Sequence, residues 1–140
     1  MAEEQAFKLK IIAPDRVFYE GDVIMVELTT TEGEIGILKR HIPLTAVIAP
    51  GVLYIKESEE EIKVASLISG FLEILPDQVT ILAEVVEWPQ EIDINRAEES
   101  KTRALRRLAE KQIETDLNRA ELALKRSVAR IEAVNKRSGQ

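Results

Sequence analysis

Four arginines in the last third of the chain are spaced so that their side chains could bind an anion together. Arg96 and Arg103 are seven positions apart and would lie on one face of a helix, whereas Arg126 and Arg130 are one turn apart further on. The two pairs become neighbours only if two helices pack together, and charge repulsion then opposes packing unless an anion lies among them. Guanidinium groups suit phosphate oxygens, so the spacing favours a triphosphate ligand.

The residues just before the first of these helices could complete such a site. A helix N-terminus presents free backbone N–H groups and a positive dipole end, both of which favour phosphate. Ile92 and Ala97 offer an apolar surface for adenine, and Asp93 and Glu87 are possible acceptors for its amino group or for ribose hydroxyls. The sequence leaves open which acceptor serves which group.

A simpler interpretation of the same residues is that they only start a helix. Asp93 is a suitable N-cap, and the segment 93–98 (Asp-Ile-Asn-Arg-Ala-Glu) is nearly repeated at 116–121 (Asp-Leu-Asn-Arg-Ala-Glu). A local pattern that occurs twice can open a helix without binding anything. The six residues alone therefore do not decide between the two interpretations.

The sequence does not favour an enzyme. It has no cysteine, no Gly-rich phosphate loop followed by Lys-Ser or Lys-Thr, and one histidine, His41, in a predicted loop. A bound nucleotide would therefore be a ligand rather than a substrate, and we predict no catalytic or metal-binding residues. No stretch approaches the ~20 apolar residues of a membrane-spanning helix, so we expect any membrane link to come through a partner.

Charge is divided unevenly along the chain. Residues 1–90 hold seven Lys and Arg against sixteen Asp and Glu, a net charge of −9, whereas residues 91–140 hold twelve against nine, a net charge of +3. This division suggests two surfaces with different neighbours, although a solvated helical tail would show the same bias. Scarce aromatic residues and the acidic body argue against nucleic-acid binding.

The first 88 residues have the pattern of a β-sandwich domain. Phe7, Leu9 and Ile11 alternate with lysines, and later runs are rich in strand-forming residues. Gly36 and Gly70 lie inside this pattern and would mark bends or bulges. We predict an antiparallel sandwich, within an α+β fold, with strands at residues 7–11, 23–31, 35–38, 44–48, 52–56, 62–68, 71–75 and 79–86.

Residues 89–140 have the composition of a helical hairpin. Pro89 ends the strand pattern, and from Asp93 onward there is no proline and no glycine before Gly139. We expect a new N-cap at Thr115 and Asp116 to separate two helices. Their apolar faces are narrow and rich in alanine; the predicted sets are Ala97, Ala104, Leu105, Leu108 and Ala109, and Leu117, Ala120, Leu124, Val128, Ile131 and Val134.

A narrow alanine-rich face buries little apolar area, so the hairpin should be held less firmly than the sandwich. A second helix of ~20 residues is ~30 Å long, and swinging it out would move a basic rod across the width of a domain. This is the basis for a predicted switch. The alternative is a permanently packed hairpin, which periodicity alone does not exclude.

Two local stretches and the order of elements resemble a known family. Residues 31–44 (TEGEIGILKRHIPL), 69–74 (SGFLEI) and 79–83 (VTILA) are similar to segments of the epsilon subunits of bacterial rotary ATP synthases. Lys39 stands where that family commonly has a proline, a departure confined to a loop. The resemblance extends from Phe7 to about Val134 and implies a sandwich followed by two helices.

Residues 92–97 (IDINRA) are similar to the Ile-Asp-x-x-Arg-Ala pattern of the ATP-binding members of that family. The resemblance implies that ATP is a regulatory ligand, with or without magnesium. The implied nucleotide site consists of Glu87, Ile92, Asp93, Arg96, Ala97, Arg103, Arg126 and Arg130.

The resemblance also implies a non-catalytic role in a proton-translocating complex at the cytoplasmic face of the bacterial plasma membrane. The sandwich is expected to bind the gamma subunit and the c-subunit ring. The extended helices would reach the alpha and beta subunits and inhibit ATP hydrolysis, and ATP would favour the folded hairpin. The alternative is a purely structural adaptor whose hairpin is fixed and indifferent to nucleotide.

Overall fold

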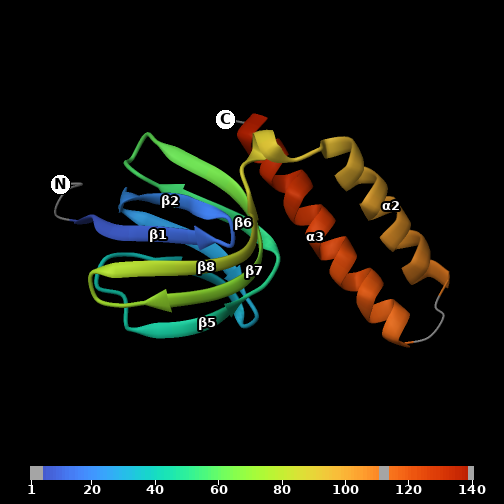
Figure 1. Ribbon diagram of the computed structural model, residues 1–140, viewed down its shortest axis with the longest axis horizontal. Coiled ribbons are helices and arrows are strands. Elements are labelled where there is room, and N and C mark those ends of the chain that lie inside the picture. Colours follow the sequence, from blue (N-terminus) through green and yellow to red (C-terminus); the bar gives the residue numbers. More distant parts are fainter. Residues whose placement is uncertain (1–4, 111–113, 139–140) are drawn as a thin grey trace.

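The computed structural model describes residues 5–110 and 114–138 as a β-sandwich joined to two helices (Figure 1). This arrangement confirms the predicted fold. The strands are β1 (Phe7–Ala13), β2 (Arg16–Val23), β3 (Met25–Thr30), β4 (Gly33–Ile37), β5 (Leu44–Ile48), β6 (Gly51–Lys56), β7 (Ile62–Ile74) and β8 (Gln78–Glu87), followed by the 3₁₀ turn η1 (Pro89–Glu91) and the helices α2 (Ile94–Glu110) and α3 (Glu114–Ser138).

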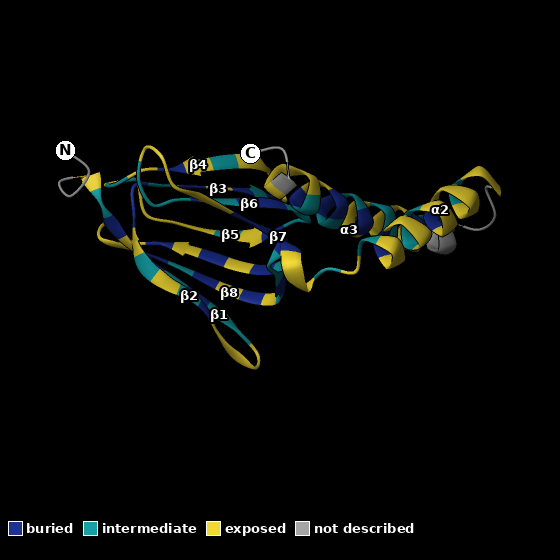
Figure 2. Cartoon of the chain, turned by 90° about the horizontal axis from the view of Figure 1, so that it is seen from above, coloured by how far each residue is buried: buried dark blue, intermediate teal, exposed yellow. Residues whose placement is uncertain are grey.

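The strands follow the order β2-β1-β8-β7-β5-β3-β4, with β6 pairing to β3 and β7. Figure 2 shows β3, β4 and β6 in one layer and β1, β2 and β8 in the other. Adjacent strands are antiparallel, with one exception: β1 and β8 run parallel. Alternate residues such as Leu9, Ile11 and Ile81 point inward and form one buried core.

Strand β7 contributes to both layers of the sandwich, because a bulge divides it into two halves. Its first half pairs with β6, its second half pairs with β5, and its register with β8 shifts around Ser69 and Gly70. Gly70 lies at this shift with φ +143°, which confirms the predicted bulge. The two strands predicted at 62–68 and 71–75 form one long strand on either side of the bulge. Gly36 pairs with Glu27 in unbroken register, so the bend expected there was wrong.

The sequence interpretation missed strand β2. Only Phe18 and Val23 are buried in it, and polar residues separate these two positions, so no apolar alternation is visible. β2 lies at the edge of the sheet and pairs with β1 alone. An edge strand needs few apolar residues, because little of its surface faces the core.

Helix α3 lies between α2 and the sandwich, packing on β6, β7 and η1, whereas α2 packs mainly on α3 (Figure 1). Five consecutive residues of β7, 64–68, are buried because the core covers one face and α3 the other. On α2 only Ala97 and Ala104 are buried. Leu105 is 47% exposed and Ala109 is exposed, which corrects their predicted burial: α2 packs mainly on α3 and presents one narrow face to it.

The predicted boundary between the helices was also wrong by a short distance. Helix α3 has already begun at Glu114, so Thr115 and Asp116 belong to its first turn. The residues between the two helices, 111–113, lie outside the described ranges. With no glycine or proline near the junction, the sequence carries little signal for its position.

Candidate functional site

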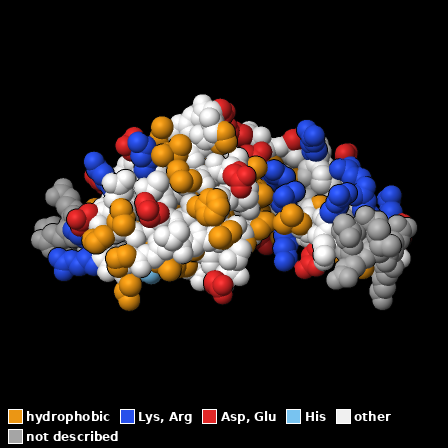
Figure 3. Space-filling model, turned by 60° about the horizontal axis from the view of Figure 1, so that its bottom comes forward, with side chains coloured by type: hydrophobic (Ala, Val, Ile, Leu, Met, Phe, Trp, Pro, Cys, Tyr) orange, Lys and Arg blue, Asp and Glu red, His pale blue; other side chains and the backbone are white. Residues whose placement is uncertain are grey.

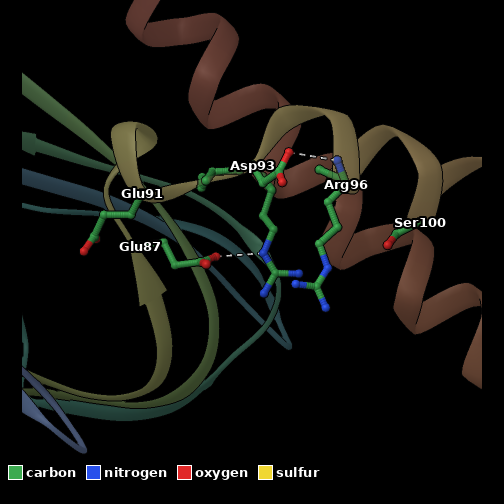
Figure 4. A pocket seen from close by; sticks show the side chains of 8 residues that line it. Glu87, Glu91, Asp93, Arg96 and Ser100 are labelled. Atoms are coloured by element: carbon green, nitrogen blue, oxygen red, sulfur yellow. Dashed lines mark hydrogen bonds and ion pairs between the residues drawn. The ribbon is translucent and has the colours of Figure 1, made fainter.

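A pocket of about 410 Å³ opens where the end of β8, η1 and the start of α2 meet α3 (Figure 4). Side chains from all four elements reach it, so it exists only while the hairpin is packed on the sandwich. Six of the eight predicted nucleotide-site residues line it, together with two that were not predicted. The lining residues are Glu87, Glu91, Ile92, Asp93, Arg96, Ala97, Ser100 and Arg130.

The start of α2 is positioned by capping. The 3₁₀ turn η1 begins at Pro89, and the chain is extended at Ile92 before α2 begins. One carboxylate oxygen of Asp93 accepts a hydrogen bond from the backbone N–H of Arg96 at 3.1 Å, and its carbonyl accepts one from the N–H of Ala97 at 3.0 Å. Asp93 is thus the N-cap of α2, and one of its carboxylate oxygens is already engaged in that role.

Glu87 and Arg130 form an ion pair across the pocket. The Nε of Arg130 donates to Oε1 of Glu87 at 2.7 Å, and each side chain is 30% exposed. The hydroxyl of Ser66 on the adjacent strand β7 lies 3.4 Å from the same carboxylate oxygen. Glu87 is the last residue of β8, so this ion pair joins the end of β8 to the middle of α3.

Arg96 contributes a cation that is not neutralised by a neighbour. Within the described ranges its guanidinium has no ion-pair partner, and Figure 4 shows it extending toward the same space as Glu87. Arg130, by contrast, is matched by Glu87. The unpaired positive charge of the pocket is thus concentrated at Arg96.

The structure does not bring all four predicted arginines together. Arg103 and Arg126 are exposed and do not line the pocket, although Arg103 Nη2 donates to Oγ of the lining residue Ser100 at 3.0 Å. Two of the four guanidinium groups, those of Arg96 and Arg130, therefore line the pocket, and the repulsion expected among all four stays a prediction. Figure 3 shows the basic side chains over the helices instead spread along their surface.

Two lining residues were missed by the sequence interpretation. Ser100 lies between Arg96 and Arg103 on one face of α2, and helical periodicity could have identified it. Glu91 could not have been found in that way, because its partner Arg16 is distant in the sequence. Arg16 binds it at 2.8 Å and Trp88 N–H donates to the same oxygen at 2.8 Å, so the pKa of Glu91 is lowered, mainly by Arg16.

Comparison with protein families matches both parts of the chain. Residues 6–89 match the beta-sandwich domain of the ATP synthase Delta/Epsilon chain, and residues 90–135 match its long alpha-helix domain. The ATP synthase epsilon chain of Caldanaerobacter subterraneus is 46% identical over 134 residues, covering 95% of this chain and 96% of that protein.

The chain belongs to the ATP synthase epsilon family.

As an epsilon chain it is a non-catalytic subunit of the central stalk of an F-type ATP synthase, which confirms the family and the absence of an enzymatic role inferred from the sequence. The epsilon chain of Halalkalibacterium halodurans is 44% identical over 129 residues, covering 91% of this chain and 96% of that protein. The epsilon chain of Acetobacterium woodii, described as sodium ion specific, is 43% identical over 104 residues, covering 74% and 78%.

The fold also occurs in solved structures. A chain of the Euglena gracilis mitochondrial ATP synthase superposes with a TM-score of 0.79 at 22% identity, covering 91% of this chain and 80% of that one. A chain of the Tetrahymena thermophila mitochondrial enzyme superposes with a TM-score of 0.61 at 12% identity, covering 91% and 96%. Neither helix in the described ranges combines the length and apolar character needed to cross a bilayer.

Proposed function

We propose that this epsilon chain couples rotation in a proton-translocating ATP synthase and restrains ATP hydrolysis through α2 and α3. In this proposal the sandwich binds the gamma subunit and the c-subunit ring. The extended helices reach the alpha and beta subunits, and ATP, with or without magnesium, favours the folded hairpin. The complex holds the subunit at the cytoplasmic face of the bacterial plasma membrane.

The observation that carries the nucleotide proposal is the pocket between the hairpin and the sandwich. Arg96 supplies a free guanidinium beside the N-terminal turn of α2, where backbone dipoles also favour phosphate. Ile92 and Ala97 supply apolar surface for the base. Arg103 is hydrogen-bonded to the lining residue Ser100, and Arg126 lies one helical turn before the lining residue Arg130. Both arginines could therefore reach a triphosphate that extends out of the pocket.

Ligand binding at this pocket would bias the hairpin because the pocket needs α3 in place. A ligand that binds only the closed form stabilises it by about 2.7 kcal/mol at one hundred times its Kd. The contact to be biased is small: Val52 and Val64 of the sandwich pack with Ala133 of α3, flanked by Tyr54 and Ile92. The ligand's binding energy is enough to shift the balance of such a contact.

The proposed rotor contact is supported by a row of apolar side chains on the outer face of the sandwich. The row crosses five strands in register, through pairs that join β5 to β7, β7 to β8, β8 to β1 and β1 to β2. Exposed apolar residues that are contiguous in this way mark protein contacts. The row consists of Val47, Phe71, Leu82, Ile12 and Val17, of which the first three are 47%, 53% and 51% exposed and Val17 is 53% exposed.

Figure 3 shows hydrophobic side chains gathered on one side of the sandwich, whereas basic side chains gather over the helices. The separation suits two kinds of neighbour. We assign the apolar row to the gamma subunit. The exposed arginines and lysines of α2 and α3 are assigned to acidic segments of the alpha and beta subunits, which they would meet when the helices extend.

The decisive experiment is isothermal titration of ATP into the purified chain. Arg96→Ala should weaken ATP binding at least ten-fold, because it removes the free cation of the pocket. Arg119→Ala is the matched control, since Arg119 occupies the same position in the repeated motif on α3 and does not line the pocket. No detectable binding by the parent chain at millimolar ATP would refute the nucleotide proposal.

A structural adaptor with a fixed hairpin is the second candidate, and one observation favours it. Groups of the chain itself form the cap at Asp93 and the ion pair between Glu87 and Arg130, and both contacts hold the hairpin in one place. A thermal melt with and without ATP separates the candidates, because only the first predicts a rise in Tm with ligand concentration.

A further inference from the structure

Helix α3 is fastened to the sandwich by very few specific contacts. Among the described side chains, the pair of Glu87 and Arg130 is the one ion pair that joins α3 to a strand. The surrounding apolar contact depends on Ala133, a small residue, against Val52 and Val64. Small apolar surfaces hold a helix against a sheet but discriminate weakly between neighbouring registers, whereas a hydrogen-bonded charge pair has one geometry.

The geometry of this pair leaves Arg130 able to bind something else. Glu87 accepts from Nε, and a guanidinium has five N–H donors, so the N–H groups of the two terminal nitrogens remain available. Arg130 also lines the pocket beside Arg96. Glu87 thus offsets the charge of Arg130 without blocking the edge that a phosphate would use.

We propose that Glu87 is the latch of the closed hairpin: it holds α3 on the sandwich before any ligand is bound and orients Arg130 toward the pocket. In this view an anionic ligand does not create the closed form but adds to its stability. Opening requires the separation of two partly buried charges, and this sets the resting balance between closed and open hairpins. The proposal deepens the proposed switch but holds even for a chain that never binds ATP.

The chain itself provides a way to measure closure. It has a single tryptophan, Trp88, and no cysteine, and Trp88 lines a groove together with Arg137 near the end of α3. Arg137→Cys, labelled with a thiol-reactive energy acceptor, therefore places the acceptor beside Trp88 only when the hairpin is closed. Trp88 is attached to the sandwich by stacking on Phe18 with ring centroids 4.2 Å apart, so it stays in place when the helices leave.

The experiment compares energy transfer in the labelled full-length chain without nucleotide. Glu87→Gln should raise the ratio of open to closed hairpins about five-fold, the effect of losing a partly exposed, hydrogen-bonded charge pair. Glu121→Gln is the matched control, because it removes an ion pair between Glu121 and Lys125 that lies entirely within α3, and transfer should not change. Circular dichroism would establish that the sandwich remains folded in both variants.

Two further variants test the pairing itself. Arg130→Gln should open the hairpin as much as Glu87→Gln, and the double variant should open it no further, because both substitutions remove the same contact. The exchanged pair Glu87→Arg with Arg130→Glu should restore part of the transfer. Unchanged transfer in Glu87→Gln, or additive effects in the double variant, would overturn the proposal. Because no nucleotide is present, neither result depends on whether the chain binds ATP.

Discussion

The indole of Trp88 stacks on the ring of Phe18, with centroids 4.2 Å apart and planes 19° from parallel. This contact attaches the segment between β8 and α2 to the edge strand β2, so Trp88 anchors the junction. The ion pair of Arg16 with Glu91 reinforces it from the same strand. The junction therefore has contacts with the sandwich that do not involve α2 or α3, and any movement of the hairpin would start after Glu91.

The junction should loosen in acid. Arg16 holds the pKa of Glu91 below its ordinary value of 4.5, so Glu91 contributes stability that is present above that pH and is lost as the pH falls below it. We expect Trp88 fluorescence to change in this range before the sandwich unfolds. In Glu91→Gln this early change should be absent, and an identical acid profile in that variant would assign the change to other carboxylates.

The Tyr19 hydroxyl should contribute measurably to stability. It donates a hydrogen bond to Glu57, which Lys63 also binds at 2.8 Å, and burial together with this bond raises the pKa of Tyr19. Tyr19→Phe should lower the free energy of unfolding by about 1 kcal/mol, the typical net value of one hydrogen bond. Urea denaturation measures this loss. Tyr54→Phe is the control, and an equal loss there would contradict the assignment.

The bulge at Gly70 should tolerate no side chain. A Cβ at this position would lie 2.2 Å from the carbonyl oxygen of Leu82, and the φ of +143° is already unfavourable for other residues. Gly70→Ala should cost at least about 3 kcal/mol, since backbone strain and a backbone clash combine. Gly33→Ala isolates the strain, because Gly33 has φ +123° with no atom near its Cβ, and about 1 kcal/mol is expected. Thermal or urea unfolding measures the loss of stability in each variant. Equal losses in Gly70→Ala and Gly33→Ala would show that the structure relaxes around the added Cβ at Gly70.

The apolar row should matter for assembly and little for folding. Phe71→Ser changes a side chain that is 53% exposed, so the isolated chain should keep its Tm within a few degrees but lose binding to the gamma subunit. Leu72→Ser, one position along and fully buried, should instead lower the Tm strongly. Co-purification with the gamma subunit measures the first effect. Unchanged binding by Phe71→Ser would remove the row from that contact.

Local patterns in the sequence determined the strands with one buried face, the helical tail and the N-cap at Asp93, because each depends on residues only a few positions apart. They also brought Ile92, Asp93, Arg96 and Ala97 together, since these lie within six consecutive residues. Periodicity of this kind depends only on residues that are close in the sequence, so it can be recognised without knowing the rest of the fold.

Only the tertiary structure decided which distant side chains meet. The partner of Arg130 is Glu87, 43 positions earlier, and the partner of Glu91 is Arg16, 75 positions earlier. Arg103 and Arg126 have the right spacing along their helices but remain outside the pocket, because the rotation of each packed helix is set by small buried residues such as Ala104 and Ala133. Helical spacing places arginines on a face, and the packing of that face against its neighbour determines whether they reach the pocket.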